Sequence, residues 1–166
     1  MFFSSKETDM DNQNGRITQD VERLSIFELA GKLFGLDILK SREVVPLPRF
    51  TPLPNSDDTF YGVFNLRGEI FPLIDVSPVL GLPPKQIQSD DMVILVDNSI
   101  GFEMGILVDK IHSVLTYLPS EVKMPRGIAG KSLEFYLGGI LHYKHNLIHI
   151  LDVDSLLKAK KILAHY

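Results

Sequence analysis

The chain of 166 residues contains no cysteine. It therefore has no disulfide framework, no thiol nucleophile and no thiolate metal site. It also lacks any run of about 20 apolar residues, the length that a membrane-spanning helix requires. The first residues, Met1–Glu7, turn polar too soon to provide the apolar core of a signal peptide. We therefore expect a cytoplasmic protein without direct membrane insertion.

Basic residues are outnumbered, with 17 Lys and Arg against 21 Asp and Glu, which gives a net charge of −4 at pH 7. Nucleic-acid-binding proteins concentrate positive charge, and this sequence has no basic stretch interleaved with aromatic residues. It also lacks a Gly-x-Ser-x-Gly elbow and a Walker loop. The sequence thus predicts no nucleic-acid partner, no catalytic residue, no cofactor and no enzyme activity.

The remaining composition is ordinary for a globular protein, with 45% hydrophobic and 23% charged residues. A chain of this length forms one domain, or one compact unit of two small halves. Residues 1–20 are polar and acidic without periodicity, so we predict a disordered leader there. The folded domain is expected over residues 21–163.

Short apolar runs separated by turn residues predict several β-hairpins. They are expected at residues 24–38, 60–75, 92–108 and 135–151, with turns at Ala30-Gly31, near Gly68-Glu69, at Asp97-Asn98-Ser99 and at His145-Asn146. Residues 111–118 are predicted to be extended. Many short strands at close intervals favour barrels or a sandwich.

The other segments have less regular signals. Residues 41–45 are expected as a helical turn or an extended edge, and the four prolines between 46 and 58 predict a loop. Residues 76–80 are predicted to form a short helix or helical turn, and residues 119–131 a loop. A C-terminal helix is expected to be capped by Asp152 or Asp154.

An internal repeat appears when the sequence is shifted by 77 residues. Residues 62–80 then lie on residues 139–157 without a gap, and four positions are identical while eight more are apolar in both copies. Each copy has the pattern strand, turn, strand, Asp, helix. This predicts two similar β units, although two amphipathic hairpins of unrelated origin can also be aligned to this extent.

Three histidines lie in the last predicted hairpin. A turn at His145 and Asn146 would make His142 and His149 cross-strand neighbours, with Cβ atoms about 5 Å apart. Such a pair could hold zinc if a third ligand were present. The repeat argues against this, because the equivalent positions of the first copy carry an asparagine and a proline. An alternative hypothesis, from a different functional class, is a metal-binding enzyme that uses His142 and His149.

The run Gly62–Asp75, with the sequence GVFNLRGEIFPLID, resembles the signature of the CheW family of chemotaxis coupling proteins. In that signature Gly-Val-x-Asn-Leu-Arg-Gly is followed by two or three residues, then a proline, two apolar residues and an aspartate. Further stretches resemble the family in the same order, namely residues 34–38 with 42–44, 105–111, 136–140, 148–152 and 156–157. The resemblance covers about residues 24–157.

The resemblance implies a mainly β fold of two intertwined, small, SH3-like five-stranded β-barrels with a short internal helix and a C-terminal helix. It also implies a non-enzymatic adaptor at membrane-bound receptor arrays. The adaptor would couple the cytoplasmic tip of chemoreceptors (methyl-accepting chemotaxis proteins) to the regulatory domain of the histidine kinase CheA. Flagellar chemotaxis, pilus-driven twitching and second-messenger pathways all use such couplers, and the sequence leaves the choice among them open.

Carried onto matching positions, the family's receptor-side residues are Ser41, Glu43, Gly62, Asn65, Arg67 and Gly105. Val44 and Val114 are candidates to line a groove between the barrels, where a receptor helix would pack. Purely structural roles remain as alternatives. Arg67 could brace the two barrels and Glu43 could be a solvated charge. The glycines could relieve crowding in the strands, and the valines could be buried in the core. At Ser41 the sequence departs from the family, in which an apolar β-branched residue is usual.

Overall fold

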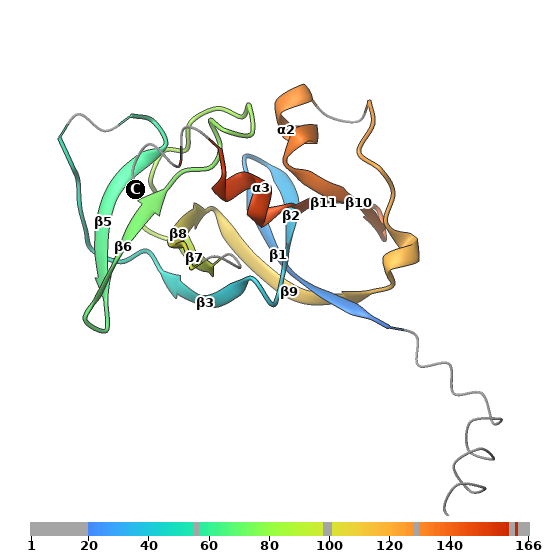
Figure 1. Cartoon of the computed structure of the whole chain (residues 1–166), viewed down its shortest axis with the longest axis horizontal. Helices are drawn as coiled ribbons and strands as arrows, with labels where there is room; N and C mark the ends of the chain where they lie inside the picture. Colours follow the sequence, from blue (N-terminus) through green and yellow to red (C-terminus); the bar gives the residue numbers. More distant parts are fainter. Residues whose placement is uncertain (1–19, 55–56, 98–100, 128–129, 160–161, 163–166) are drawn as a thin grey trace, which may run out of the picture.

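The computed structural model describes residues 20–54, 57–97, 101–127, 130–159 and 162, and these form two β-sheets (Figure 1). The leader expected at 1–20 lies outside the described residues except for its last position. One sheet has the strand order β10-β11-β2-β1-β9, and the other has the order β3-β7-β8-β6-β5-β4. The expected mainly β fold of two intertwined units is confirmed, but the second sheet has six strands where five were expected, because the two-residue strand β4 pairs with β5.

The strands of the first sheet are β1 (Glu22–Leu29), β2 (Lys32–Asp37), β9 (Lys110–Tyr117), β10 (Leu137–Tyr143) and β11 (Asn146–Leu151). Those of the second sheet are β3 (Ser41–Pro46), β4 (Phe50–Thr51), β5 (Phe60–Leu66), β6 (Glu69–Ile74), β7 (Met92–Asp97) and β8 (Glu103–Val108). The helical segments are η2 (Pro119–Glu121), α2 (Lys131–Phe135) and α3 (Val153–Leu157). No helix within the described ranges has the length and apolar character needed to cross a membrane.

In each sheet, a short segment of chain connects the two edge strands. In the second sheet the edge strands β3 and β4 are separated along the chain by residues 47–49 alone. In the first sheet Lys123, which follows edge strand β9, forms an antiparallel bridge with Ile140 of the other edge strand, β10. We therefore call the two units the first barrel (β1, β2, β9–β11) and the second barrel (β3–β8).

The second barrel is inserted into the first. The hairpin β1–β2 pairs with β9 and β11, which follow much later in the chain. The hairpin β7–β8 pairs back onto β3 and β6. The main chain passes from the first barrel to the second at residues 38–40 and returns at Asp109, between β8 and β9. These two places are called the first and second crossings below.

The predicted repeat is confirmed at the level of single residues. Strands β10 and β11 have the bounds of β5 and β6 plus 77. Both hairpins have a register shift at the same position, next to Gly62 in one and Gly139 in the other. The turn residues Arg67 and Lys144 are also equivalent, and both have left-handed backbones with φ of 52° and 55°. The two barrels therefore share one hairpin design.

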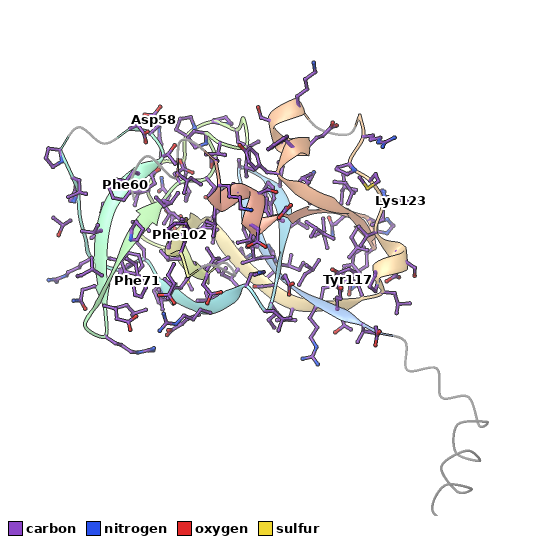
Figure 2. All side chains as sticks on the ribbon, in the orientation of Figure 1. Asp58, Phe60, Phe71, Phe102, Tyr117 and Lys123 are labelled. Carbon is purple, nitrogen blue, oxygen red and sulfur yellow. The ribbon has the colours of Figure 1, made fainter. Side chains whose placement is uncertain are left out.

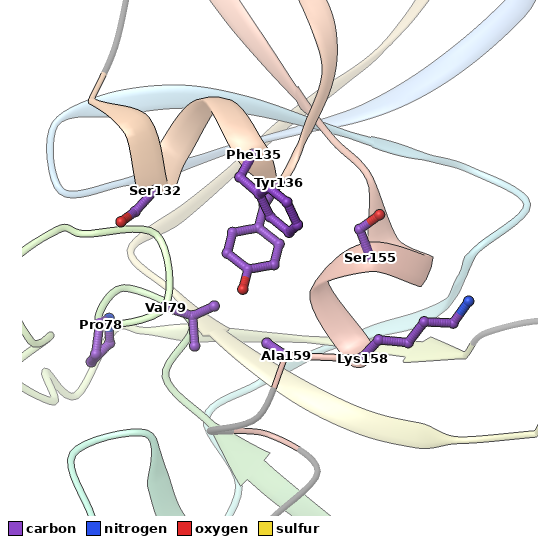
Figure 3. Close-up of a pocket in the computed structure, with 8 residues that line it drawn as sticks. All are labelled: Pro78, Val79, Ser132, Phe135, Tyr136, Ser155, Lys158 and Ala159. Carbon is purple, nitrogen blue, oxygen red and sulfur yellow. The ribbon is translucent and has the colours of Figure 1, made fainter.

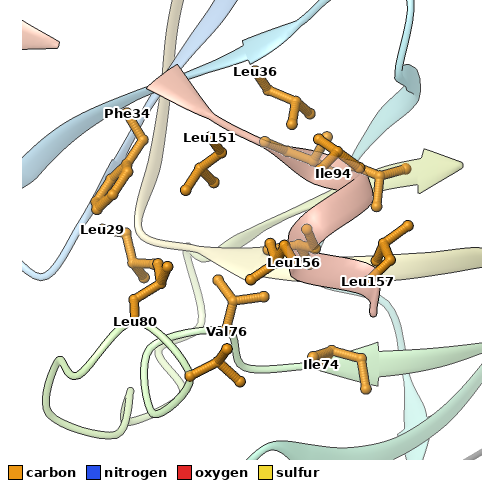
Figure 4. Close-up of a cluster of buried hydrophobic side chains, with 14 of the residues drawn as sticks. Leu29, Phe34, Leu36, Ile74, Val76, Leu80, Ile94, Leu151, Leu156 and Leu157 are labelled. Atoms are coloured by element: carbon orange, nitrogen blue, oxygen red, sulfur yellow. The ribbon is translucent and has the colours of Figure 1, made fainter. Parts of the chain in front are cut away.

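Buried apolar side chains form one extensive core at the seam between the barrels (Figure 4). It joins Phe34 of β2, Ile74 of β6, Ile94 of β7 and Leu156 of α3. A smaller cluster lies inside each barrel: the first contains Leu24, Ile26, Tyr117, Leu141, Ile148 and Ile150, and the second contains Phe64, Phe71, Leu73, Val93, Leu95 and Leu107. Figure 2 shows Phe60 and Phe71 on the second barrel and Tyr117 and Lys123 on the first.

Helix α3 covers part of this seam. Its N-cap is Asp152, one of the two predicted caps, and the Asp152 carboxylate accepts a hydrogen bond from the backbone N–H of Ser155 at 3.2 Å. The helix buries Val153, Leu156 and Leu157. Its apolar side therefore completes the core that the strands begin.

Two predicted turns are wrong by one residue. The β5–β6 turn lies at Arg67 and Gly68, and the β10–β11 turn lies at Lys144 and His145. A two-residue hairpin turn whose central residues both have positive φ favours glycine at its second position. Gly68, with φ of 87°, occupies that second position, whereas the prediction had placed it first.

The loops also contain more structure than expected. Strand β4 lies inside the predicted loop 46–58, and η2 and the start of α2 lie inside the predicted loop 119–131. Residues 76–80 form a helical turn, as expected, in which the Leu80 N–H donates to the Val76 carbonyl at 3.1 Å. Residues 41–45 are extended and lie at the sheet edge, one of the two predicted alternatives.

Gly62→Ala should destabilise the fold strongly. Gly62 has φ of 152°, and a Cβ there would lie 2.1 Å from the Thr51 carbonyl oxygen, so strand β4 would have to move. We expect the free energy of unfolding in urea to fall by about 2 kcal/mol or more. The control is Gly130→Ala, where a Cβ would meet no atom within 4 Å. Equal stability of the two variants would contradict the close contact of β4 with β5.

Candidate functional site: a charged surface on the second barrel

Four of the predicted receptor-side residues and the groove candidate Val44 lie on β3 or at the β5–β6 tip. Ser41, Glu43 and Val44 belong to β3, Asn65 to β5, and Arg67 to the turn. Arg67 and Glu43, which are 24 residues apart in sequence, form a two-point ion pair. The Nη2–Oε1 distance is 2.6 Å and the Nη1–Oε2 distance is 2.9 Å. The ion pair therefore links the tip of the hairpin to the edge strand of the same barrel.

The Asn-Leu-Arg-Gly run explains the position of the arginine. The Asn65 side-chain oxygen accepts a hydrogen bond from the Gly68 N–H at 3.0 Å, which closes the turn. Arg67 then occupies a left-handed position at the tip, with 75% of its side chain exposed. Ile70, on the same hairpin and opposite Asn65, is 61% exposed. The tip thus presents a guanidinium and an apolar side chain together.

A second ion pair, which sequence reasoning missed, lies beside the first. The Nη1 atom of Arg42 lies 2.9 Å from Glu103 Oε1 and 3.5 Å from Glu69 Oε2. The Arg42 guanidinium also lies 5.8 Å from the centre of the Phe71 ring. A pocket of about 190 Å³ is lined by Arg42, Glu43, Leu66, Arg67, Glu69 and Phe71. We call these six residues the charged surface.

Gly62 of β5 and Gly105 of β8 lie in the wall of the second barrel, and both are buried. A Cβ on Gly105 would lie 2.7 Å from the Phe64 ring and 2.7 Å from Val93. Gly62 is pressed against the Thr51 carbonyl in the same way. Both glycines therefore permit close packing within the second barrel.

Val114 lies apart from the others, on β9 of the first barrel. It is opposite Ser25 of β1, and it is 53% exposed. Val44 on β3 is half-buried and packs against the core at the seam. Strands β3 and β9 occupy equivalent edge positions in the two sheets, so these two valines lie on equivalent strands of the two barrels.

Another pocket contains none of the predicted site residues. It has a volume of about 590 Å³ and is lined by Pro78, Val79, Ser132, Phe135, Tyr136, Ser155, Lys158 and Ala159. Figure 3 shows the Tyr136 hydroxyl pointing into this space. Phe135 packs edge-on against Tyr136 and is largely exposed. Sequence reasoning did not group these residues, because they come from α2, α3, the residues just after these helices and the helical turn at 76–80.

The expected pairing of His142 with His149 is wrong. His142 lies opposite Leu147, and His149 lies opposite Ile140, because the turn is one residue earlier than predicted. His149 is buried beside Phe34, and its Nδ1 atom donates to the Leu33 carbonyl at 2.8 Å. In the part of the chain that the structure describes, no three acidic or histidine side chains gather as metal ligands do.

Comparison with known proteins identifies the family. A family model for the "CheW-like domain" matches residues 23–161. The chain belongs to the CheW-like domain family. Among curated CheW-like relatives, "Chemotaxis protein CheW" of Treponema pallidum is 28% identical over 147 residues, which cover 84% of each chain. The Bacillus subtilis protein of the same name is 26% identical over 137 residues, covering 82% of this chain and 86% of the relative.

A solved structure agrees with the CheW-like assignment. It is the crystal structure of "scaffolding protein TtCheW" from Thermoanaerobacter tengcongensis, with a TM-score of 0.75 and 26% sequence identity. The match covers 89% of this chain and 94% of that chain. Both barrels of the present structure therefore fall within the shared fold.

His149 should make stability depend on pH. Burial lowers the pKa of His149, so the unfolded chain binds a proton before the folded chain does as the pH falls below about 6.5. The free energy of unfolding should therefore decrease with falling pH, by up to about 1.4 kcal/mol per pH unit for this group. Urea unfolding between pH 7.5 and 5 should show a smaller slope for His149→Phe than for the exposed-site control His142→Gln. Equal slopes in the two variants would contradict this assignment.

Proposed function

We propose that this CheW-like protein is a non-enzymatic scaffold that couples chemoreceptors to the histidine kinase CheA in a chemotaxis-type signalling array. The observation that carries the proposal is the Arg67–Glu43 ion pair on a hairpin tip whose sequence matches the family signature. Membership of the CheW-like family supports it, as do the relatives named chemotaxis proteins and the one named a scaffolding protein.

The charged surface suits a helical partner that carries carboxylates or exposed carbonyls. A guanidinium has five N–H donors in a fixed fork, and the contacts with Glu43 use two of its nitrogens on one side. Three quarters of the Arg67 side chain remains exposed, so donors are left for a second acceptor. Ile70 offers an apolar contact on the same tip. We infer that the cytoplasmic tip of a chemoreceptor, a helical hairpin, docks here.

We infer the kinase partner from the fold. The regulatory domain of CheA would dock onto an end of a barrel that the receptor-side surface does not occupy. With these partners, the protein would act at the cytoplasmic side of membrane-bound receptor arrays. Flagellar, pilus-driven and second-messenger pathways would all present these partner classes, so the proposal concerns the partners and not the pathway.

Charge reversal at the tip tests the receptor interface. Arg67→Glu places two carboxylates side by side, and we expect binding to a soluble chemoreceptor-tip fragment to weaken at least about tenfold, or about 1.4 kcal/mol. The midpoint of urea unfolding should change little, because an exposed ion pair contributes about 0–1 kcal/mol. Titration calorimetry measures the affinity.

The controls separate the pair from general charge effects. Arg126→Glu reverses an exposed charge on the first barrel and should bind the fragment as the unmodified protein does. Glu43→Arg combined with Arg67→Glu restores an ion pair of opposite polarity; weak binding by this double variant would indicate that Arg67 itself contacts the receptor. Normal binding by Arg67→Glu alone would refute the proposed interface.

A further inference from the structure

An ion pair lies at each crossing between the barrels. At the first crossing, Lys40 Nζ lies 3.5 Å from Asp154 Oδ2, and both side chains are partly exposed. At the second crossing, Asp109 Oδ1 lies 2.5 Å from Lys85 Nζ. Lys85 belongs to the connector between β6 and β7, which has no regular secondary structure. The second pair is the more buried, and the inference concerns it.

Lys85 is a buried cation between two carboxylates. Its side chain is 5% exposed, and its ammonium lies 2.8 Å from Asp91 Oδ1, whose side chain is 2% exposed. Burial alone would lower the pKa of Lys85, but the hydrogen bonds to Asp109 and Asp91 outweigh burial and raise it. The ammonium is therefore charged and held in one position. We call Lys85, Asp91 and Asp109 the latch.

Asp109 connects this cation to the first barrel. Its Oδ2 atom accepts a hydrogen bond at 2.9 Å from the N–H of Ala30, in the β1–β2 turn. Its own N–H donates to the Glu28 carbonyl of β1 at 2.9 Å. One carboxylate thus contacts Lys85 of the second barrel and Ala30 of the first.

Lys85 is in turn fixed to the second barrel. Its backbone N–H donates at 2.7 Å to Asp75, the buried residue that follows β6. Its carbonyl accepts a hydrogen bond from the Tyr61 hydroxyl of β5. The latch therefore joins two well-anchored points, one in each barrel, through the residue at which the chain crosses.

The position of the latch relates it to the candidate receptor surface. Strand β3, with Glu43 and Val44, begins directly after the first crossing. Strand β9, with Val114, begins one residue after Asp109. We propose that the latch positions β9 relative to β3 for receptor binding, with Lys85 and Asp109 as positioning residues; this rests on the proposed function.

The apolar seam cannot do this alone. Hydrophobic burial is proportional to area and has no direction, so it holds the barrels together but defines their orientation less sharply than directional contacts do. An ion pair with fixed hydrogen-bond geometry does select an orientation. The apolar core at the seam holds the two barrels together, and the latch fixes their relative orientation.

Asp109→Asn and Asp91→Asn form a matched pair of variants. Each removes one carboxylate charge from Lys85 and keeps the shape of the side chain, but only Asp109 lies at the crossing. Because the chain has no cysteine, Ile70→Cys on β6 and Ser113→Cys on β9 provide unique spin-label sites, both exposed. Pulsed electron paramagnetic resonance then measures the distance between the two labels, one on each barrel, in the full-length protein.

We expect Asp109→Asn to broaden the distance distribution at least about twofold or to shift its mean, and Asp91→Asn to leave it unchanged. Without the labels, Asp109→Asn should bind the chemoreceptor-tip fragment at least about fivefold more weakly, and Asp91→Asn within about twofold of the unmodified protein. If Asp109→Asn does not fold, Asp109→Glu replaces it. That variant keeps the charge but moves the carboxylate by one methylene, so the mean distance should shift.

Each other outcome is decisive. An unchanged distance distribution in the Asp109 variant overturns the latch, and so does equal broadening in both variants. A changed distribution with unchanged receptor affinity overturns the positioning role. If the unmodified protein fails to bind the fragment, the proposed function fails, while the label distances still show whether the latch sets the placement of β9.

Discussion

The first barrel is built from two separate stretches of chain, 22–37 and 110–151, with the whole second barrel inserted between them. This insertion is the constraint on which the other features depend. Because the barrels share the two crossings, their facing sides must be buried together, and the apolar core at the seam is larger than the cluster inside either barrel. The two barrels are therefore parts of one cooperative unit.

Charged groups have different tasks at different depths. Arg67 and Glu43 lie at the surface, where an ion pair adds little stability and the guanidinium stays largely exposed. Lys85 is enclosed by two carboxylates, where losing one partner removes a charge-assisted hydrogen bond from a buried ammonium. The surface pair suits recognition, and the buried group suits a fixed geometry. Glu43 lies on β3, which follows the first crossing, and Lys85 contacts Asp109, which directly precedes β9.

Local pattern predicted much of this molecule. Turn chemistry and apolar alternation located the hairpins, and the shift of 77 residues identified the two equivalent ones. The Arg67 tip could be found because its turn is encoded by neighbouring residues. The contacts of Lys85 could not, because Lys85 lies in a polar connector without periodicity and its partner Asp109 is 24 positions away. The His142–His149 register failed for a related reason: a one-residue change in a turn alters every pair beyond it.

The inserted topology also sets an order for biosynthesis. The hairpin β1–β2 leaves the ribosome first, but its partner strands β9 and β11 follow only after the stretch 41–108 has been made. At about 5–20 residues per second, this hairpin waits several seconds with Phe27 and Phe34 uncovered. The stretch 41–108 can meanwhile form its own sheet and offer a surface for those rings. The rate of translation through this stretch therefore affects the yield of folded protein.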